Sequence, residues 1–173
     1  MLAHNFKTAI DLQIPETHRQ ALIKTLVYLE TDKLTHHRTE FRFGRHRIPE
    51  DGSAIKMGNM AYLNMSCKPT KFDGLFNMNV WSVAYECGTI ACLGGTAEMI
   101  GHVTFGSDLI SNNEALNELF YPFEMTNPHI HDRISFEEIT TKHAAQALRN
   151  YLTNGAANWE SVVPPEVWTT RFA

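Results

Sequence analysis

The chain has 173 residues, of which 43% are hydrophobic and 20% charged, and its formal net charge is −4. This usage argues against wholesale disorder, the net charge disfavours bulk binding to nucleic acid, and the length predicts one compact domain over residues 1–173. No apolar run approaches the roughly 18 residues of a membrane span, and the N-terminus lacks the apolar stretch of a secretory signal, so we expect a cytoplasmic protein without membrane contact.

The first predicted element is a helix over residues 15–34. A proline suits its first position, and Leu22, Leu26 and Leu29 form one apolar stripe at helical spacing. Glycines and prolines then punctuate residues 35–59, which predicts irregular chain or a short hairpin there.

Alternating apolar and polar residues predict short strands over residues 41–43 and 76–80. Apolar residues at helical spacing predict three further helices, over residues 89–100, 113–120 and 141–153. The predicted fold class is therefore mainly α with a small β component (α+β).

The helix predicted over residues 89–100 contains Gly94 and Gly95, each of which costs a helix interior about 1 kcal/mol relative to alanine. Such a cost is usual where another element packs very close to the backbone. We therefore expect this helix at the packing centre of the fold, with Gly101 ending it.

The most distinctive motif is Cys-Gly-Thr-Ile-Ala-Cys-Leu-Gly-Gly over residues 87–95. A Phe-x-Met-x-x-Trp segment precedes it, and a helix that closes with Thr-Asn-Gly, then Trp159, follows it. In this order the segments resemble a family of uncharacterised bacterial and phage proteins over roughly residues 72–160. The resemblance implies a shared fold and nothing more, and a phage or prophage is the setting that we expect for the protein. Asn158 departs from the family pattern, which has an acidic residue at that place.

Cys87 is a candidate nucleophile because it directly precedes a predicted helix, whose N-terminus would lower the pKa of its thiol. His131 is a candidate for the partner base, as are His102, His129 and His143. A small buried cysteine that lets backbones pack closely explains the same residue, and no local signature of a cysteine hydrolase is present. A hydrolase or transferase using Cys87 and His131 is therefore kept as an alternative function.

We expect no metal and no other cofactor. Cys87 and Cys92 lie at the edge of the usual spacing for structural zinc, and no second close pair accompanies them. On one helix they would point about 140° apart and could not chelate together. His129 and His131 could chelate in a loop, although paired surface histidines more often bind nothing. Three cysteines, an odd and low number, also predict no disulfide framework.

The segment of residues 33–47 concentrates positive charge, with five lysines and arginines against one acidic residue. Residues 1–47 hold 8 Lys+Arg against 5 Asp+Glu, whereas residues 48–173 hold 7 against 14. This asymmetry predicts a surface with a basic and an acidic pole.

Arginines interleaved with aromatic residues can grip an acidic protein surface, or hold phosphates and stack on bases. They are also typical of a solvated hairpin whose phenylalanines face the core. We predict a small non-enzymatic protein-binding protein that acts through residues 33–47, with a nucleic-acid-binding accessory protein as a further alternative. The predicted partner-binding residues are Arg38, Phe41, Arg42, Phe43, Arg45 and Arg47.

Overall fold

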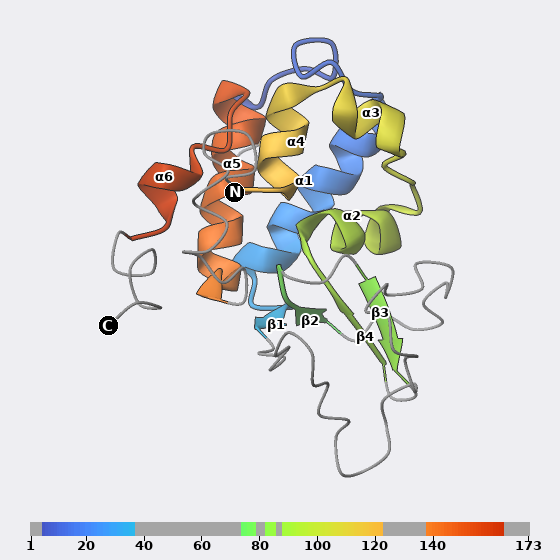
Figure 1. Cartoon of the computed structure of the whole chain (residues 1–173), viewed down its shortest axis with the longest axis vertical. Coiled ribbons are helices and arrows are strands. Elements are labelled where there is room, and N and C mark those ends of the chain that lie inside the picture. Colours follow the sequence, from blue (N-terminus) through green and yellow to red (C-terminus); the bar gives the residue numbers. More distant parts are fainter. Residues whose placement is uncertain (1–4, 37–73, 79–81, 86–87, 123–137, 165–173) are drawn as a thin grey trace.

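The structure is a computed structural model that describes residues 5–36, 74–78, 82–85, 88–122 and 138–164. In this part of the chain six helices pack above one small sheet, which confirms the prediction of a mainly α fold with a small β component (Figure 1). The elements are α1 (Glu16–Glu30), β1 (Thr35–His36), β2 (Leu75–Phe76), β3 (Ser82–Tyr85), β4 (Gly88–Ala91), α2 (Leu93–Gly101), α3 (Ser107–Ser111), α4 (Glu114–Phe120), α5 (Thr141–Asn154) and α6 (Trp159–Val162).

The sheet has the strand order β1-β2-β4-β3. The pairs β1–β2 and β2–β4 are parallel, and β3 pairs antiparallel with β4. The strand predicted over residues 76–80 overlaps β2 at Phe76 alone, because the chain leaves the sheet at residue 77 and turns at residue 78, and residues 79–80 lie outside the described residues. The strand predicted over residues 41–43 lies outside the described residues, and β3, α3 and α6 were not predicted.

Helix α1 buries Leu22, Leu26 and Leu29, as its apolar stripe predicted. It ends four residues before the predicted boundary because the chain then turns through Asp32, which has a φ of 53°. The helix spans 15 residues, so its axis is about 22 Å long. It runs from the N-terminal segment at one end of the molecule to the sheet at the other (Figure 1).

Helix α2 begins at Leu93, so the prediction of a helix from residue 89 was wrong over its first four residues. Residues 88–91 instead form β4, the strand that lies between β2 and β3. Threonine and isoleucine in this stretch are β-branched and favour a strand, and pairing on both sides overrides the helical spacing of the apolar residues. Cys92 takes the N-cap position, with an extended backbone.

The close approach between elements occurs at the end of α2. Gly94 and Gly95 are buried, as expected, but the tight contact that the structure shows is at Gly101. A Cβ built on Gly101 would lie 2.3 Å from the Cβ of Ala21 in α1. Gly101, which the sequence analysis predicted only as the end of the helix, therefore allows α1 and α2 to pack closely. The next residue, His102, ends the helix with a φ of 53°.

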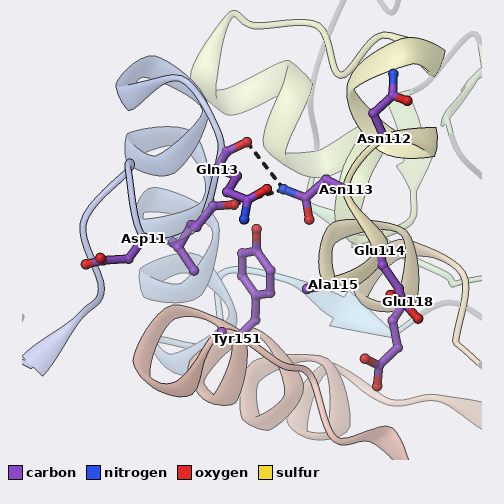
Figure 2. A pocket seen from close by; sticks show the side chains of 10 residues that line it. Asp11, Gln13, Asn112, Asn113, Glu114, Ala115, Glu118 and Tyr151 are labelled. Atoms are coloured by element: carbon purple, nitrogen blue, oxygen red, sulfur yellow. Dashed lines mark hydrogen bonds between the residues drawn. The ribbon is translucent and has the colours of Figure 1, made fainter.

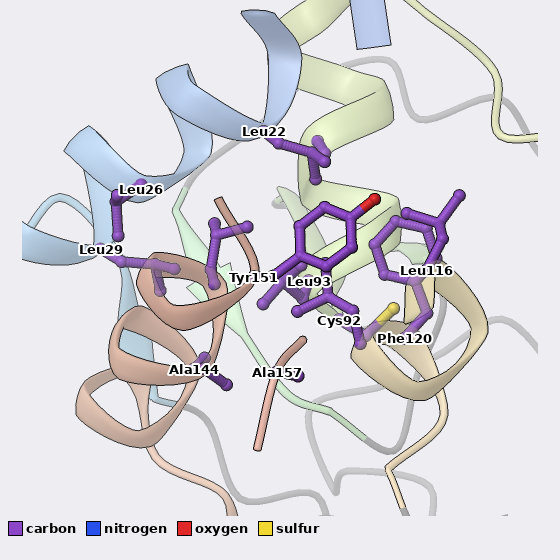
Figure 3. Close-up of a cluster of buried hydrophobic side chains, with 14 of the residues drawn as sticks. Leu22, Leu26, Leu29, Cys92, Leu93, Leu116, Phe120, Ala144, Tyr151 and Ala157 are labelled. Atoms are coloured by element: carbon purple, nitrogen blue, oxygen red, sulfur yellow. The ribbon is translucent and has the colours of Figure 1, made fainter. Parts of the chain in front are cut away.

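Helices α4 and α5 begin and end as their capping residues predict. The Asn113 side chain accepts a hydrogen bond from the Leu116 N–H at the start of α4. Thr140 forms a capping box with His143 at the start of α5, and Gly155 ends that helix with a φ of 87°. The core between these helices and α1 includes Leu22, Leu26, Leu29, Cys92, Leu93, Leu116, Phe120, Ala144, Tyr151 and Ala157 (Figure 3).

Candidate binding pocket

A pocket of about 530 Å³ opens between the N-terminal segment, the start of α4 and the end of α5 (Figure 2). This volume lies within the range of small-ligand sites in proteins. The lining residues are mostly polar. They are Asp11, Leu12, Gln13, Asn112, Asn113, Glu114, Ala115, Glu118, Tyr151 and Gly155.

The N-terminal wall of the pocket is a tight turn that its own hydrogen bonds hold. The Asp11 carboxylate accepts bonds from the backbone N–H and the hydroxyl of Thr8, at 3.1 and 2.7 Å. The Leu12 N–H donates to the Thr8 carbonyl at 3.1 Å. Gln13 has a φ of 54°, a left-handed conformation that few non-glycine residues adopt. This geometry places Asp11 and Gln13 at the pocket before the chain enters α1.

Asn113 joins this wall to α4. Its side-chain amide donates to the carbonyl of Leu12 at 2.9 Å and more weakly to that of Gln13 at 3.3 Å (Figure 2). Its side-chain oxygen at the same time caps α4 through the Leu116 N–H at 3.0 Å. One buried amide thus fixes two pocket walls that lie about a hundred residues apart in the chain.

Tyr151 rises from α5 beneath these groups, with its hydroxyl directed toward Gln13 and Asn113 (Figure 2). The side chain is fully buried, yet its hydroxyl has no hydrogen-bond partner. Burial also raises the pKa of this phenol above its ordinary value, so the group is neutral at physiological pH. A buried hydroxyl without a partner costs about 1–3 kcal/mol, which marks this position as one that a ligand group can satisfy.

The charges at the pocket are mainly negative. Hydrogen bonds from Thr8 lower the pKa of Asp11, which therefore stays ionised. Desolvation raises the pKa of Glu118, and the nearby carboxylates of Glu160 and Glu114 raise it further. The one cation that the structure shows at the rim is Lys7, whose side chain packs against Gly155 and whose charge acts on Asp11.

Helix α6 and its N-cap residue hold Glu118 in place through hydrogen bonds. The indole N–H of Trp159 donates to the Glu118 carbonyl at 2.9 Å, and the backbone of Asn158 bonds the Glu118 carboxylate. The carbonyl lies in the last turn of α4, where helical carbonyls have no partner within the helix. The C-terminal part of the described chain therefore positions an acidic residue of the pocket.

Comparisons with protein-family models, with curated proteins and with solved structures find no match to this chain. The assignment of a site therefore depends on the geometry of the described residues and on the sequence.

The structure does not test the site residues predicted from the sequence. Cys87 and His131 lie outside the described residues, as do Arg38, Phe41, Arg42, Phe43, Arg45 and Arg47.

The argument that Cys87 precedes a helix was nevertheless wrong, because strand β4 separates it from α2. Among its proposed partner bases, His102 is the exposed C-cap of α2. His143 bonds the Thr140 backbone N–H within the capping box of α5. Both histidines therefore lie at helix ends.

Two further findings concern metals and membranes. Within the described ranges, no group of three or more histidine, cysteine, aspartate and glutamate side chains could hold a metal ion. No helix among the same residues is long and apolar enough to cross a membrane.

Sequence reasoning missed the pocket, although two signals pointed toward it. Glu114 and Glu118 are spaced i, i+4 on a predicted helix, which places two carboxylates on one face. Tyr151 belongs to the apolar stripe of α5 and is the one member of that stripe with a polar end. Neither signal indicates that the N-terminal turn forms a pocket together with α4 and α5.

Replacing Tyr151 with phenylalanine should leave the fold as stable as the parent or stabilise it by about 1 kcal/mol, because the change removes an unpaired buried hydroxyl. Urea denaturation followed by circular dichroism measures this. A loss of more than about 1 kcal/mol would show that the hydroxyl has a partner in solution.

Proposed function

We propose that this protein acts by binding other proteins rather than by catalysing a reaction, with an acidic contact surface at the pocket and a basic one at residues 33–47. The observation that carries the proposal is the pocket with the unpartnered Tyr151 hydroxyl beneath it. Buried polar groups in folded proteins nearly always have partners, and a bound water, ion or ligand group is one way in which such a group is satisfied.

The described residues place the pocket and the start of the basic segment at opposite ends of α1. The pocket is built where the chain enters this helix, and Lys33, the first residue of the segment, lies just past the other end. The axis of α1 is about 22 Å long, well over the Debye length of about 8 Å at physiological salt. Lys33 can therefore attract an acidic group without its charge being cancelled by the pocket, whereas residues 37–47 lie outside the described residues.

Two carboxylates of the pocket also have the electrostatic pattern of an acid–base pair. The pKa values of Asp11 and Glu118 are shifted in opposite directions, a pattern that carboxylate acid–base catalysis uses. The Asp11 carboxylate, however, is exposed and accepts both of its hydrogen bonds from Thr8, which holds the turn. These two hydrogen bonds favour a structural role for Asp11 in the turn, and its charge acts on the pocket rim only at long range.

The basic surface gives the first test. Replacing Arg42, Arg45 and Arg47 together with alanine should weaken binding of an acidic partner and flatten its salt dependence, because fewer ion contacts remain to be screened. The melting temperature should change little, since solvated charges usually contribute below about 1 kcal/mol each. The measurement is a titration with poly-glutamate and with a short DNA duplex at low and moderate salt. Lys142→Ala is the control, because Lys142 is an exposed cation outside the segment.

Unchanged affinity for poly-glutamate in the folded triple variant would remove residues 33–47 from the binding surface. Strong binding of the duplex, with none of poly-glutamate, would favour the nucleic-acid alternative instead. Reaction of Cys87 with a thiol probe at neutral pH, together with turnover of an ester or amide that a Cys87→Ser variant loses, would support the cysteine enzyme and overturn the proposal.

A further inference from the structure

We infer that the pocket receives the cationic end of an arginine or lysine side chain from a partner protein. This inference rests on the proposed function and names the chemistry that its acidic surface recognises. Three of the residues that line the pocket, Asp11, Glu114 and Glu118, are acidic. A guanidinium or ammonium group offers only hydrogen-bond donors, which match carboxylates and the acceptor lone pairs of a tyrosine hydroxyl.

The Tyr151 hydroxyl adds an observation independent of the acidic residues. It is fully buried, has no partner and is directed toward the pocket wall formed by Gln13 and Asn113 (Figure 2). The Gln13 side chain is exposed, so it can move aside without breaking the core. A cationic donor that enters there would give the hydroxyl its missing partner, because a neutral phenol accepts a hydrogen bond through its oxygen.

An exposed apolar residue next to Asp11 in the chain favours a peptide side chain over a free amine. Ile10 belongs to the same N-terminal turn as Asp11 and is 88% exposed. An exposed apolar side chain next in the chain to a pocket residue can cover an apolar residue of a bound peptide or the aliphatic stem of its arginine or lysine. A free diamine or a small guanidinium compound would gain little from this contact.

The protonation state of Glu118 should control the affinity. The groups that face this carboxylate are Glu114 on α4, Glu160 on α6 and the Asn158 N–H, with Asp11 and Lys7 across the pocket. Its pKa is raised above the ordinary 4.5, and a bound cation favours the ionised form. Affinity should therefore be full above the raised pKa and fall as the pH drops through it. Glu118→Gln should weaken binding at neutral pH and remove this part of the pH dependence.

The test uses a capped five-residue peptide with a central arginine flanked by alanine and leucine, titrated into the full-length protein by calorimetry. The matched control peptide has citrulline, which keeps the shape of arginine without its charge. We expect saturable binding of the arginine peptide and at least about tenfold weaker binding of the citrulline peptide, because a charge-assisted hydrogen bond is about twice as strong as a neutral one. Glu118→Gln and Tyr151→Phe should each weaken the arginine peptide by about tenfold.

The Ile10→Ala variant and free agmatine distinguish the two sources of the cation, which are a side chain of a partner protein and a free amine. Weaker binding of the peptide to Ile10→Ala, with agmatine binding unchanged, supports a partner side chain. Agmatine that binds as tightly as the peptide, whether or not Ile10 is present, would overturn the peptide assignment in favour of a free amine.

Equal binding of the arginine and citrulline peptides, or full affinity in the folded Glu118→Gln variant, would overturn the inference as a whole. These outcomes would remove the cation from the acidic surface of the proposed function but leave its basic surface standing if poly-glutamate still binds residues 33–47, because the two surfaces are tested by separate probes. Loss of both interactions would remove the proposed function as well.

Discussion

Replacing Trp159 with alanine should destabilise the protein by about 3–5 kcal/mol, because the change leaves a large cavity in the core. Trp159 is only 1% exposed although it belongs to a helix of four residues. Its indole also donates the bond to the Glu118 carbonyl, so the substitution leaves an unpaired carbonyl at the end of α4. Urea denaturation followed by circular dichroism measures the loss.

Trp159→Phe is the matched control, because it keeps an aromatic ring in the cavity and removes the N–H donor. Its cost should be smaller, about 1–2 kcal/mol from the lost hydrogen bond and the reduced volume. Equal costs for the two variants would mean that the hydrogen bond, and not the filled volume, dominates at this position. A Trp159→Ala variant as stable as the parent would show that α6 does not pack on the core.

Replacing Gly101 with leucine should cost about 3 kcal/mol, at the upper end of the usual range for overpacking, because the added side chain meets the Cβ of Ala21. Even the first atom of that side chain would lie 2.3 Å from the Ala21 Cβ, so α1 and α2 must separate. Both helices belong to the core, and protein interiors leave few voids to absorb such a shift. The measurement is the free energy of unfolding in urea.

Gly106→Ala is the control for the loss of a glycine, because a Cβ at Gly106 meets nothing within 4 Å. It should cost at most about 1 kcal/mol, clearly less than Gly101→Leu, because Gly106 is the N-cap of α3 and alanine is less favourable than glycine at that position. Gly101→Ala combined with Ala21→Gly tests the contact itself, since the second change removes the methyl group that the first one meets. If the double variant recovers no stability relative to Gly101→Ala, the contact between Gly101 and Ala21 does not limit the packing.

The sequence predicts those parts of this fold that depend on residues close together in the chain. The apolar stripe of α1 and the caps of α4 and α5 arise within a turn or two of helix, so spacing and residue type determine them. Strand β4 was predicted as helix because its conformation depends on pairing with β2, whose residues lie about fifteen positions earlier, and with β3, a nearby strand that was itself not predicted. No pattern within residues 88–91 records that pairing.

The pocket could not be predicted for the same reason. Its walls come from the N-terminal turn, α4 and α5, and their approach is fixed by contacts such as the bond from Asn113 to Leu12. The resemblance to bacterial and phage proteins over residues 72–160 stays a prediction. The same holds for the roles of Cys87 and of residues 33–47.

The support of Glu118 by Asn158 and Trp159 has a consequence for the timing of synthesis. Ribosomes add about 5–20 residues per second, and chain segments fold as they emerge. The turn at Asp11 appears early, yet the residues that brace the opposite wall are made nearly 150 positions later. The nascent chain therefore carries Asp11 without a shaped cavity for most of translation. Under the proposed function, a partner that requires the pocket would engage only after Trp159 has been made and has packed on α4.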